Sequence, residues 1–346
     1  MYMERRDRER SGRERRRKEY YDQNQYYDPN QYYDPNRHYS QEPRRGTDRP
    51  YRQESPGGGR PGKKKRKTTF GDVVRILLML AALAVFCFSG YQLYGFYREY
   101  KAGTDEYSGL ANDYTGEDET EDLAALEEAD DQAQSVAGRE LVTVVENGQE
   151  VSLPVMNNPI NFAELSSVNS DIVGWIRIRA LDISYPVVQT EDNDYYLHTT
   201  FEGASNIAGC IFMNCYNKPD FTDQNTIIYG HNMRNGSMFG TLSDFQDEEV
   251  YNKSKYFWIF TPDFIYQYRI FSASVVNQTG LTYQTSFSDE DFQEFVNTAF
   301  QNSVVDNTGL QVTEDDRIVT LSTCTGDDST RFVVMGRLAQ VYASKK

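Results

Sequence analysis

Hydrophobic and polar residues alternate with a period of two over much of the C-terminal half of the chain. Short runs of this kind begin at Trp175 and continue to Leu338, with Gly, Pro, Asn and Asp between them. Such alternation is typical of half-buried β-strands, and many short strands joined by tight turns favour a sheet that closes on itself. The pattern therefore predicts a mostly β fold, a closed or nearly closed β-barrel with a few short helices.

Helical signals lie between and before these strands. Ser288 is followed by three acidic residues and then by apolar residues at helical spacing, which predicts a capped amphipathic helix. Asn161, with a glutamate three residues later, predicts a second capped helix. We expect a short helix at 122–129, and a strand, an Asn-Gly turn and another strand over 141–155.

An uninterrupted apolar run precedes all of these elements. The 22 residues between Arg75 and Arg98 carry no charge, and a helix of that length, at about 1.5 Å per residue, spans a hydrocarbon core. We therefore expect one transmembrane helix at residues 73–97. The basic run K-K-K-R-K at 63–67 predicts a single-pass protein of the cell membrane with a cytoplasmic N-terminus and an extracellular C-terminal domain. A cleaved signal peptide is the alternative, but the leader and the apolar run are too long.

Charge divides the chain at the same place. Residues 1–70 have a net charge of +9 and residues 71–346 a net charge of −25, which indicates two compartments and no nucleic-acid partner. The basic part contains three Tyr-rich hexads, and we expect a disordered cytoplasmic tail that serves either as a flexible binding segment or as a passive one. Residues 98–140 hold 14 acidic residues and predict an acidic extracellular stalk, which leaves 141–346 as the folded domain.

Candidate chemistry gathers at three predicted strand ends. Cys324 ends one strand, Arg331 begins the next after the turn-forming T-G-D-D-S-T, and His231 follows I-I-Y-G. If the last two strands form a hairpin, Arg331 faces Cys324 at about 4.5–5.5 Å. A guanidinium there favours the thiolate and can donate to a developing oxyanion. Arg337 shares that face but lies about 20 Å further along the strand.

These residues resemble a known family. L-S-T-C, the arginine that starts the next strand, and G-H-N are similar to the sortases, which are cysteine transpeptidases of the Gram-positive cell surface. The resemblance covers residues 158–342 and is to class B, which has a helix between the two strands before the cysteine. It implies that Cys324 is the nucleophile, that His231 is the general acid and base, and that Arg331 stabilises the oxyanion and the substrate.

The resemblance also implies a reaction. A membrane-anchored sortase cleaves the C-terminal sorting signal of exported proteins at a Thr carbonyl, through an acyl-thioester, and transfers the product to an amine of the cell wall precursor. No cofactor is required. A pilin lysine amine is the acceptor in a pilin-polymerising sortase, although such enzymes usually carry a second, C-terminal span. Two competing interpretations are an L,D-transpeptidase, which places Cys and Arg almost adjacent, and a non-enzymatic surface adhesin.

Several polar residues are weaker candidates. Ser322 shares a strand face with the candidate nucleophile, so we expect it to line the substrate groove, and Asn232 is a candidate for orienting the adjacent imidazole. Cys210 and Cys215 lie five residues apart in one predicted strand and point to opposite faces, so no disulfide joins them. They also lack a paired ligand at zinc spacing, and we expect no metal site. His198 is expected to be structural or exposed.

Overall fold

The computed structural model describes residues 69–116, 120–128, 138–146 and 149–345. Contacts divide the chain into residues 1–67 and 68–346, and the elements below belong to the second unit. The predicted disordered tail, with its Tyr-rich hexads, lies outside the described residues except for its last two positions.

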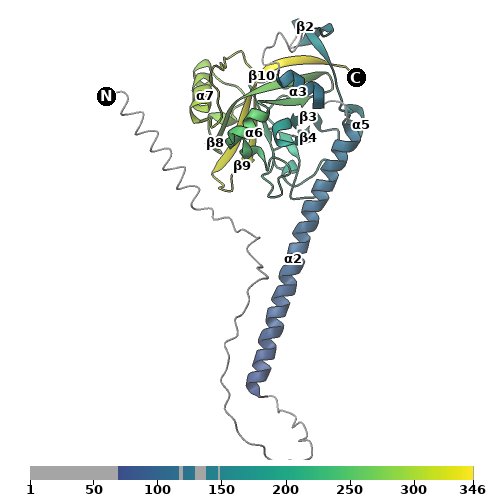
Figure 1. Cartoon of the computed structure of the whole chain (residues 1–346), viewed down its shortest axis with the longest axis vertical. Helices are drawn as coiled ribbons and strands as arrows, with labels where there is room; N and C mark the ends of the chain where they lie inside the picture. The colour runs from purple at the N-terminus through teal and green to yellow at the C-terminus, as the bar shows by residue number, and fades with distance from the viewer. Residues whose placement is uncertain (1–68, 117–119, 129–137, 147–148, 346) are drawn as a thin grey trace, which may run out of the picture. The chain divides into compact units, whose positions relative to one another are not determined.

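A closed β-barrel forms the centre of the described unit (Figure 1). Eight strands follow one another around it in the order β10-β8-β7-β3-β4-β5-β6-β9, and β9 pairs with β10 to close the ring. The hairpin of β1 and β2 attaches outside the ring, where the end of β2 runs parallel to the end of β10. The strands are β1 Leu141–Glu146, β2 Gln149–Asn157, β3 Ile172–Ile178, β4 Ile183–Val188, β5 Ile211–Met213, β6 Asn225–Tyr229, β7 Tyr256–Phe260, β8 Phe264–Asn277, β9 Ile318–Cys324 and β10 Thr330–Lys345. The predicted mostly β barrel is confirmed.

Helices cover or extend the barrel. The α-helices are α2 Phe70–Tyr114, α3 Thr120–Glu128, α5 Phe162–Val168, α6 Glu248–Lys253 and α7 Asp289–Asn302. Single 3₁₀ turns are η2 Arg179–Leu181, η3 Tyr195–Leu197, η4 Leu242–Gln246 and η5 Leu281–Tyr283. The predicted caps are present, because the side chain of Asn161 accepts from Glu164 and that of Ser288 accepts from Asp291.

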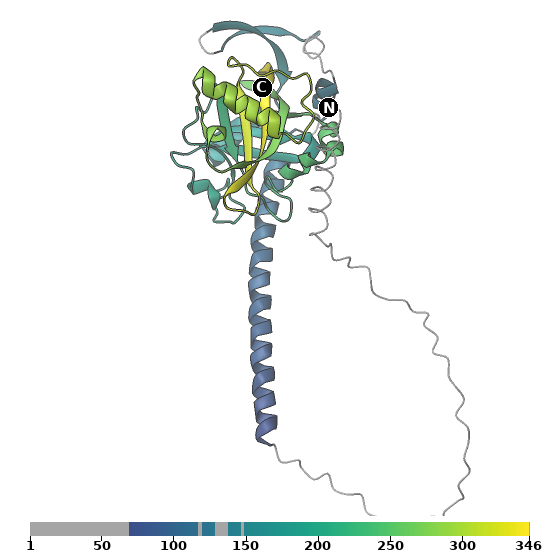
Figure 2. The ribbon, with the colours of Figure 1, turned by 90° about the vertical axis from the view of Figure 1, so that its left-hand side faces the viewer.

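The core has two parts, one on each side of the strand that carries the candidate nucleophile. Val319 and Leu321 of β9 pack into the main core inside the barrel, whereas Ile318 joins a smaller cluster under α7. Figure 2 shows α7 lying across the outside of the barrel. Every residue of β9 before Cys324 is buried, so the strand is fixed on both faces up to its last residue.

The long helix α2 has two different halves. Its N-terminal part is exposed and apolar, and by length and composition it can cross a membrane. Its C-terminal part packs against the barrel and buries Tyr107 and Leu110. The structure thus differs from the expected stalk over 98–140, because α2 continues to residue 114 and α3 also buries Leu123 and Leu126.

Candidate active site

The thiol of Cys324 is exposed at the end of β9, just beyond the buried part of that strand. The pairing of β9 with β10 places Arg331 directly opposite Cys324, which confirms the predicted hairpin register. Arg337 pairs instead with Ile318, at the far end of the strand, and its guanidinium lies 3.5 Å from Asp316. The structure therefore places Arg331, and not Arg337, beside the thiol.

His231 reaches the same edge through a parallel strand pair. β6 runs parallel to β9 with Tyr229 beside Ser322, and the amide of Gly230 donates to the carbonyl of Ser322 over 3.1 Å. Two residues beyond this pair are His231, just after the end of β6, and Cys324, the last residue of β9. Because adjacent strands are about 4.8 Å apart, this register brings imidazole and thiol to one end of the barrel.

Two buried side chains pack closely against the backbone of Gly230, just before His231. A Cβ added at Gly230 would lie 2.5 Å from Ile211 and 2.7 Å from Phe239, so only glycine fits without a shift. The imidazole Nε2 lies 2.7 Å from the carbonyl oxygen of Leu197. A carbonyl can only accept, so Nε2 carries the proton, and in the neutral ring Nδ1 is then the nitrogen with a free lone pair.

The guanidinium of Arg331 is held by three acceptors. Its Nη1 donates to the carbonyls of Asp328, at 3.0 Å, and Thr330, at 2.7 Å, and its Nη2 donates to the side-chain oxygen of Gln278 at 3.2 Å. These contacts orient the planar fork of Arg331 at the mouth of the β9–β10 loop. Arg331 still has donors left for a developing charge, since a guanidinium carries five N–H groups.

One pocket of about 210 Å³ brings the three predicted residues together. Burial raises the pKa of the Tyr229 phenol in its wall to about 12, which keeps that hydroxyl neutral. The pocket can therefore hold a chain segment against a thiol, an imidazole and a guanidinium. Its lining residues are Asn193, Leu197, Phe212, Tyr229, Gly230, His231, Ser322, Thr323, Cys324 and Arg331.

The weaker candidates take different places. Ser322 lines the pocket as expected, and its hydroxyl lies 3.0 Å from that of Tyr283. Asn232 does not line the pocket; its side-chain amide donates to the backbone carbonyl of Cys324 over 2.7 Å and so ties the histidine loop to the cysteine strand. His198 is exposed, with its ring stacked 6.2 Å from that of His231.

Two pocket residues, and one residue that holds Arg331, carry no signal in the sequence. Asn193 and Leu197 come from the segment between β4 and β5, and Gln278, which orients Arg331, follows β8. Their contribution depends on which strands are neighbours in the barrel, and hydrophobic periodicity does not encode strand order.

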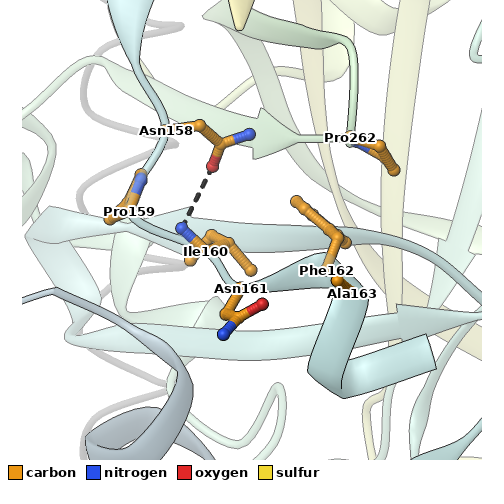
Figure 3. A pocket seen from close by; sticks show the side chains of 7 residues that line it. All are labelled: Asn158, Pro159, Ile160, Asn161, Phe162, Ala163 and Pro262. Carbon is orange, nitrogen blue, oxygen red and sulfur yellow. Dashed lines mark hydrogen bonds between the residues drawn. The ribbon is translucent and has the colours of Figure 1, made fainter. Parts of the chain in front are cut away.

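A larger pocket lies away from this chemistry. It has a volume of about 480 Å³ and lies between the β2–α5 turn and Pro262 (Figure 3). Asn158 holds this turn by accepting from the amide of Ile160 over 3.1 Å. Its lining contains no thiol, imidazole or charged side chain, so it offers no catalytic group.

The two cysteines near β5 are not joined to each other. Cys210 and Cys215 both carry free thiols, and they flank β5 rather than lying within it. Within residues 69–345, outside the gaps given above, no group of three or more His, Cys, Asp or Glu side chains is arranged to hold a metal ion.

Comparisons with known proteins find relatives of this chain. A family model described as the sortase domain matches residues 176–339. The chain is 32% identical to sortase B of Listeria monocytogenes over 272 residues, which cover 75% of this chain and 95% of that protein. It is 35% identical to sortase B of Staphylococcus aureus over 184 residues, 52% of this chain and 75% of that protein. A solved complex of Staphylococcus aureus sortase B with substrate is 34% identical, with a TM-score of 0.49, over 52% of this chain and 84% of that one.

A closed eight-stranded barrel with a thiol, an imidazole and a guanidinium around one pocket is compatible with a cysteine-dependent acyl transferase. The sequence relationship extends over nearly the whole length of a known sortase B. The chain belongs to the sortase family, class B, and is a cysteine transpeptidase of the kind that anchors surface proteins.

Proposed function

We propose that this sortase cleaves a sorting signal of exported proteins at a Thr carbonyl, with Cys324 as nucleophile, His231 as general acid and base, and Arg331 as stabiliser of substrate and oxyanion. The observation that carries the proposal is their convergence: the pairing of β9 with β6 and with β10 puts all three around one pocket.

In the first half-reaction, the thiolate of Cys324 attacks the Thr carbonyl carbon, and a bond forms between Sγ and that carbon. The carbonyl electrons move to oxygen, where Arg331 donates to the developing charge. When the tetrahedral intermediate collapses, the C–N bond to the following residue breaks, and the protonated imidazole of His231 gives its proton to the leaving amine. The product is an acyl-thioester on Cys324.

The second half-reaction reverses these roles. The neutral imidazole of His231 takes a proton from the incoming amine as that amine attacks the thioester carbon. The C–S bond then breaks, and the electrons return to Sγ as thiolate. A new amide joins the exported protein to its acceptor, and the imidazolium is restored for the next cycle. Every proton and electron pair is accounted for without a cofactor.

The long helix α2 supports the proposed cellular setting. Its apolar half supports a single-pass anchor through residues 73–97, and the basic run before it favours a cytoplasmic N-terminus with the barrel outside the cell. An amine of the cell wall precursor is then the acceptor that meets an extracellular enzyme. A pilin lysine amine is the alternative acceptor, and the described residues contain one candidate span, not two.

The test is a transfer assay with the full chain in detergent. The probes are a peptide library with a fixed Thr and randomised flanking positions, and free glycine peptides or a lysine peptide as the amine. We expect products in which the library sequence ends at Thr and is joined to the added amine by an amide bond. Cys324→Ala should form none of these products. Cys215→Ala, a second partly exposed thiol, is the matched control and should keep full activity. Transfer by Cys324→Ala at the wild-type rate would refute the proposal.

A further inference from the structure

The C-terminal half of α2 docks on the loop between β4 and β5. The side-chain amide of Asn206 donates to the carbonyl of Glu99 over 2.9 Å, and a Cβ placed on Gly103 would lie only 3.2 Å from Ala208 and from Asn206. The amide of Glu202 also donates to the carboxylate of Glu106 over 3.0 Å. Helix and loop therefore meet over two turns, with a glycine at the closest point.

Tyr107 stands at the centre of this contact and is 4% exposed. Its hydroxyl donates to the carbonyl of Gly209 and accepts from the amide of Phe201 over 3.3 Å. Its ring packs edge-on against that of Tyr185, at 5.4 Å between centroids, and the hydroxyl of Tyr185 accepts from the amide of Met238 in the loop after His231. Tyr107 therefore contacts the β4–β5 loop directly, and through Tyr185 it is linked to the loop that follows His231.

Gly209 lies between the Tyr107 hydroxyl and the carbonyl that binds the imidazole. It has a φ of +55°, and a Cβ there would lie 2.3 Å from the carbonyl oxygen of Tyr196 and 2.7 Å from that of Leu197. The Gly209 backbone therefore lies close to the Leu197 carbonyl. The carbonyl of Leu197 is the acceptor that holds Nε2 of His231 at 2.7 Å. A continuous path of contacts runs from the Tyr107 hydroxyl through Gly209 and Leu197 to His231.

We propose that Tyr107, on the helix that leads out of the apolar span, is a positioning residue for His231: it fixes the Leu197 carbonyl that selects the Nε2–H form of the imidazole. The inference rests on the proposed role of His231. Under this proposal the tautomer of His231 depends on the docking of the C-terminal half of α2 on the β4–β5 loop.

The test compares Tyr107→Phe with Tyr114→Phe in the full chain. Tyr107→Phe removes the hydroxyl but keeps the ring. Tyr114→Phe makes the same change on the same helix, next to Asn161 rather than to the histidine loop. We expect Tyr107→Phe to lower kcat by about tenfold or more, as small misplacements of a catalytic group do, with KM changed less than about twofold. Tyr114→Phe should keep both constants.

A second readout separates positioning from general stability. In alkaline buffer, ¹⁵N resonances of the imidazole report which nitrogen is protonated, and His231 is assigned by its loss in His231→Gln among only three histidines. We expect the Nε2–H form in the wild type and a mixture of tautomers in Tyr107→Phe. Gly103→Leu, which forces the helix from the loop without touching the hydroxyl, should have the same effect.

Two results would overturn the inference. In folded Tyr107→Phe, as shown by its melting curve, either a wild-type kcat or an unmixed Nε2–H signal contradicts it, and a lower melting temperature alone marks a structural role. Failure of the proposed function is distinguishable: if His231→Gln retains wild-type turnover, His231 is not the acid–base group, whereas the tautomer in Tyr107→Phe still reports whether Tyr107 positions the ring.

Discussion

Cys324 and Arg331 face each other because two strands pair in one register, and that register depends on the six-residue loop between them. An arginine further along the same strand, such as Arg337, points to the same face but does not reach the thiol. The sequence predicts this pair because parity and loop length both act locally. It does not predict that Gln278 holds the guanidinium of Arg331, since Gln278 follows β8 and lies more than 50 positions away in the chain.

The two arginines of β10 give a matched pair of substitutions. Arg331→Lys keeps the charge but loses the forked donors, and we expect single-turnover acylation to fall by about 10²–10³, as for loss of an oxyanion donor. Arg337→Lys changes a residue that pairs with Asp316 away from the thiol, and acylation should stay within about twofold of wild type. Rapid-quench measurement of acylation decides, and a dead Arg337→Lys beside an active Arg331→Lys would place the oxyanion site elsewhere.

At the scale of elements, the pairing of β6 with β9 brings the candidate catalytic residues together. Their parallel pairing aligns His231 with Cys324, although the sequence separates the two strands by a long excursion through α6, β7, β8 and α7. Alternating residues predict short strands, and Asn161 and Ser288 predict the caps of α5 and α7, because those signals are local. Strand order is set by long-range packing, so at the level of sequence only the chemistry of the two side chains indicates that His231 and Cys324 converge.

The short helix α3 is anchored by one acidic residue. Glu127 accepts from Trp258 Nε1 over 2.8 Å and forms an ion pair with Arg179. Burial raises the pKa of the Glu127 carboxyl above its usual value of 4.5, while the hydrogen bond from Trp258 and the charge of Arg179 oppose that shift. A carboxyl whose pKa is raised on folding binds its proton more tightly in the folded state, so its contribution to stability falls as pH rises from about 4.5 through the folded pKa.

Glu127→Gln tests this anchor. Glutamine retains an oxygen acceptor for Trp258 but cannot titrate, so the difference in free energy of unfolding between wild type and variant should change with pH, with the wild type relatively more stable at lower pH. Glu127→Ala, which removes the acceptor of both donors and likewise cannot titrate, should cost about 1–3 kcal/mol, with the larger cost at lower pH. Chemical denaturation over a pH series measures both. Glu164→Gln, an exposed glutamate on α5, is the control, and equal pH dependence in wild type and Glu127→Gln would refute the assignment.

For the whole molecule, the apolar run and the alternating strands predict an anchor followed by a barrel. They do not predict where the anchor helix ends, because the acidic residues after it are typical of a solvated segment. In the structure the helix continues past Arg98 to residue 114, with Tyr107 and Leu110 on its buried face. Two apolar residues among so many acidic ones do not predict a buried helix face. They are buried because they pack against the surface of the barrel.

Topology is testable on intact cells. With an epitope tag before residue 1, protease added outside should remove the barrel and leave a tagged fragment that includes residues 1–70 and the span. The basic run before the span is the reason. Loss of the tag from unpermeabilised cells, with the barrel still intact, would place the barrel in the cytoplasm and contradict the proposed orientation.

The central claim is that one thiol carries the acyl group. Rapid mixing of the full chain with an active Thr-containing peptide, without an amine, followed by intact-mass and peptide-mapping analysis, tests it most directly. The account predicts an added mass equal to the peptide up to Thr less one water, located on Cys324 and released by hydroxylamine as the Thr hydroxamate. In His231→Ala the adduct should form about 10²–10⁴ times more slowly. Peptide cleavage without an adduct, or an adduct on Cys215, would contradict the account.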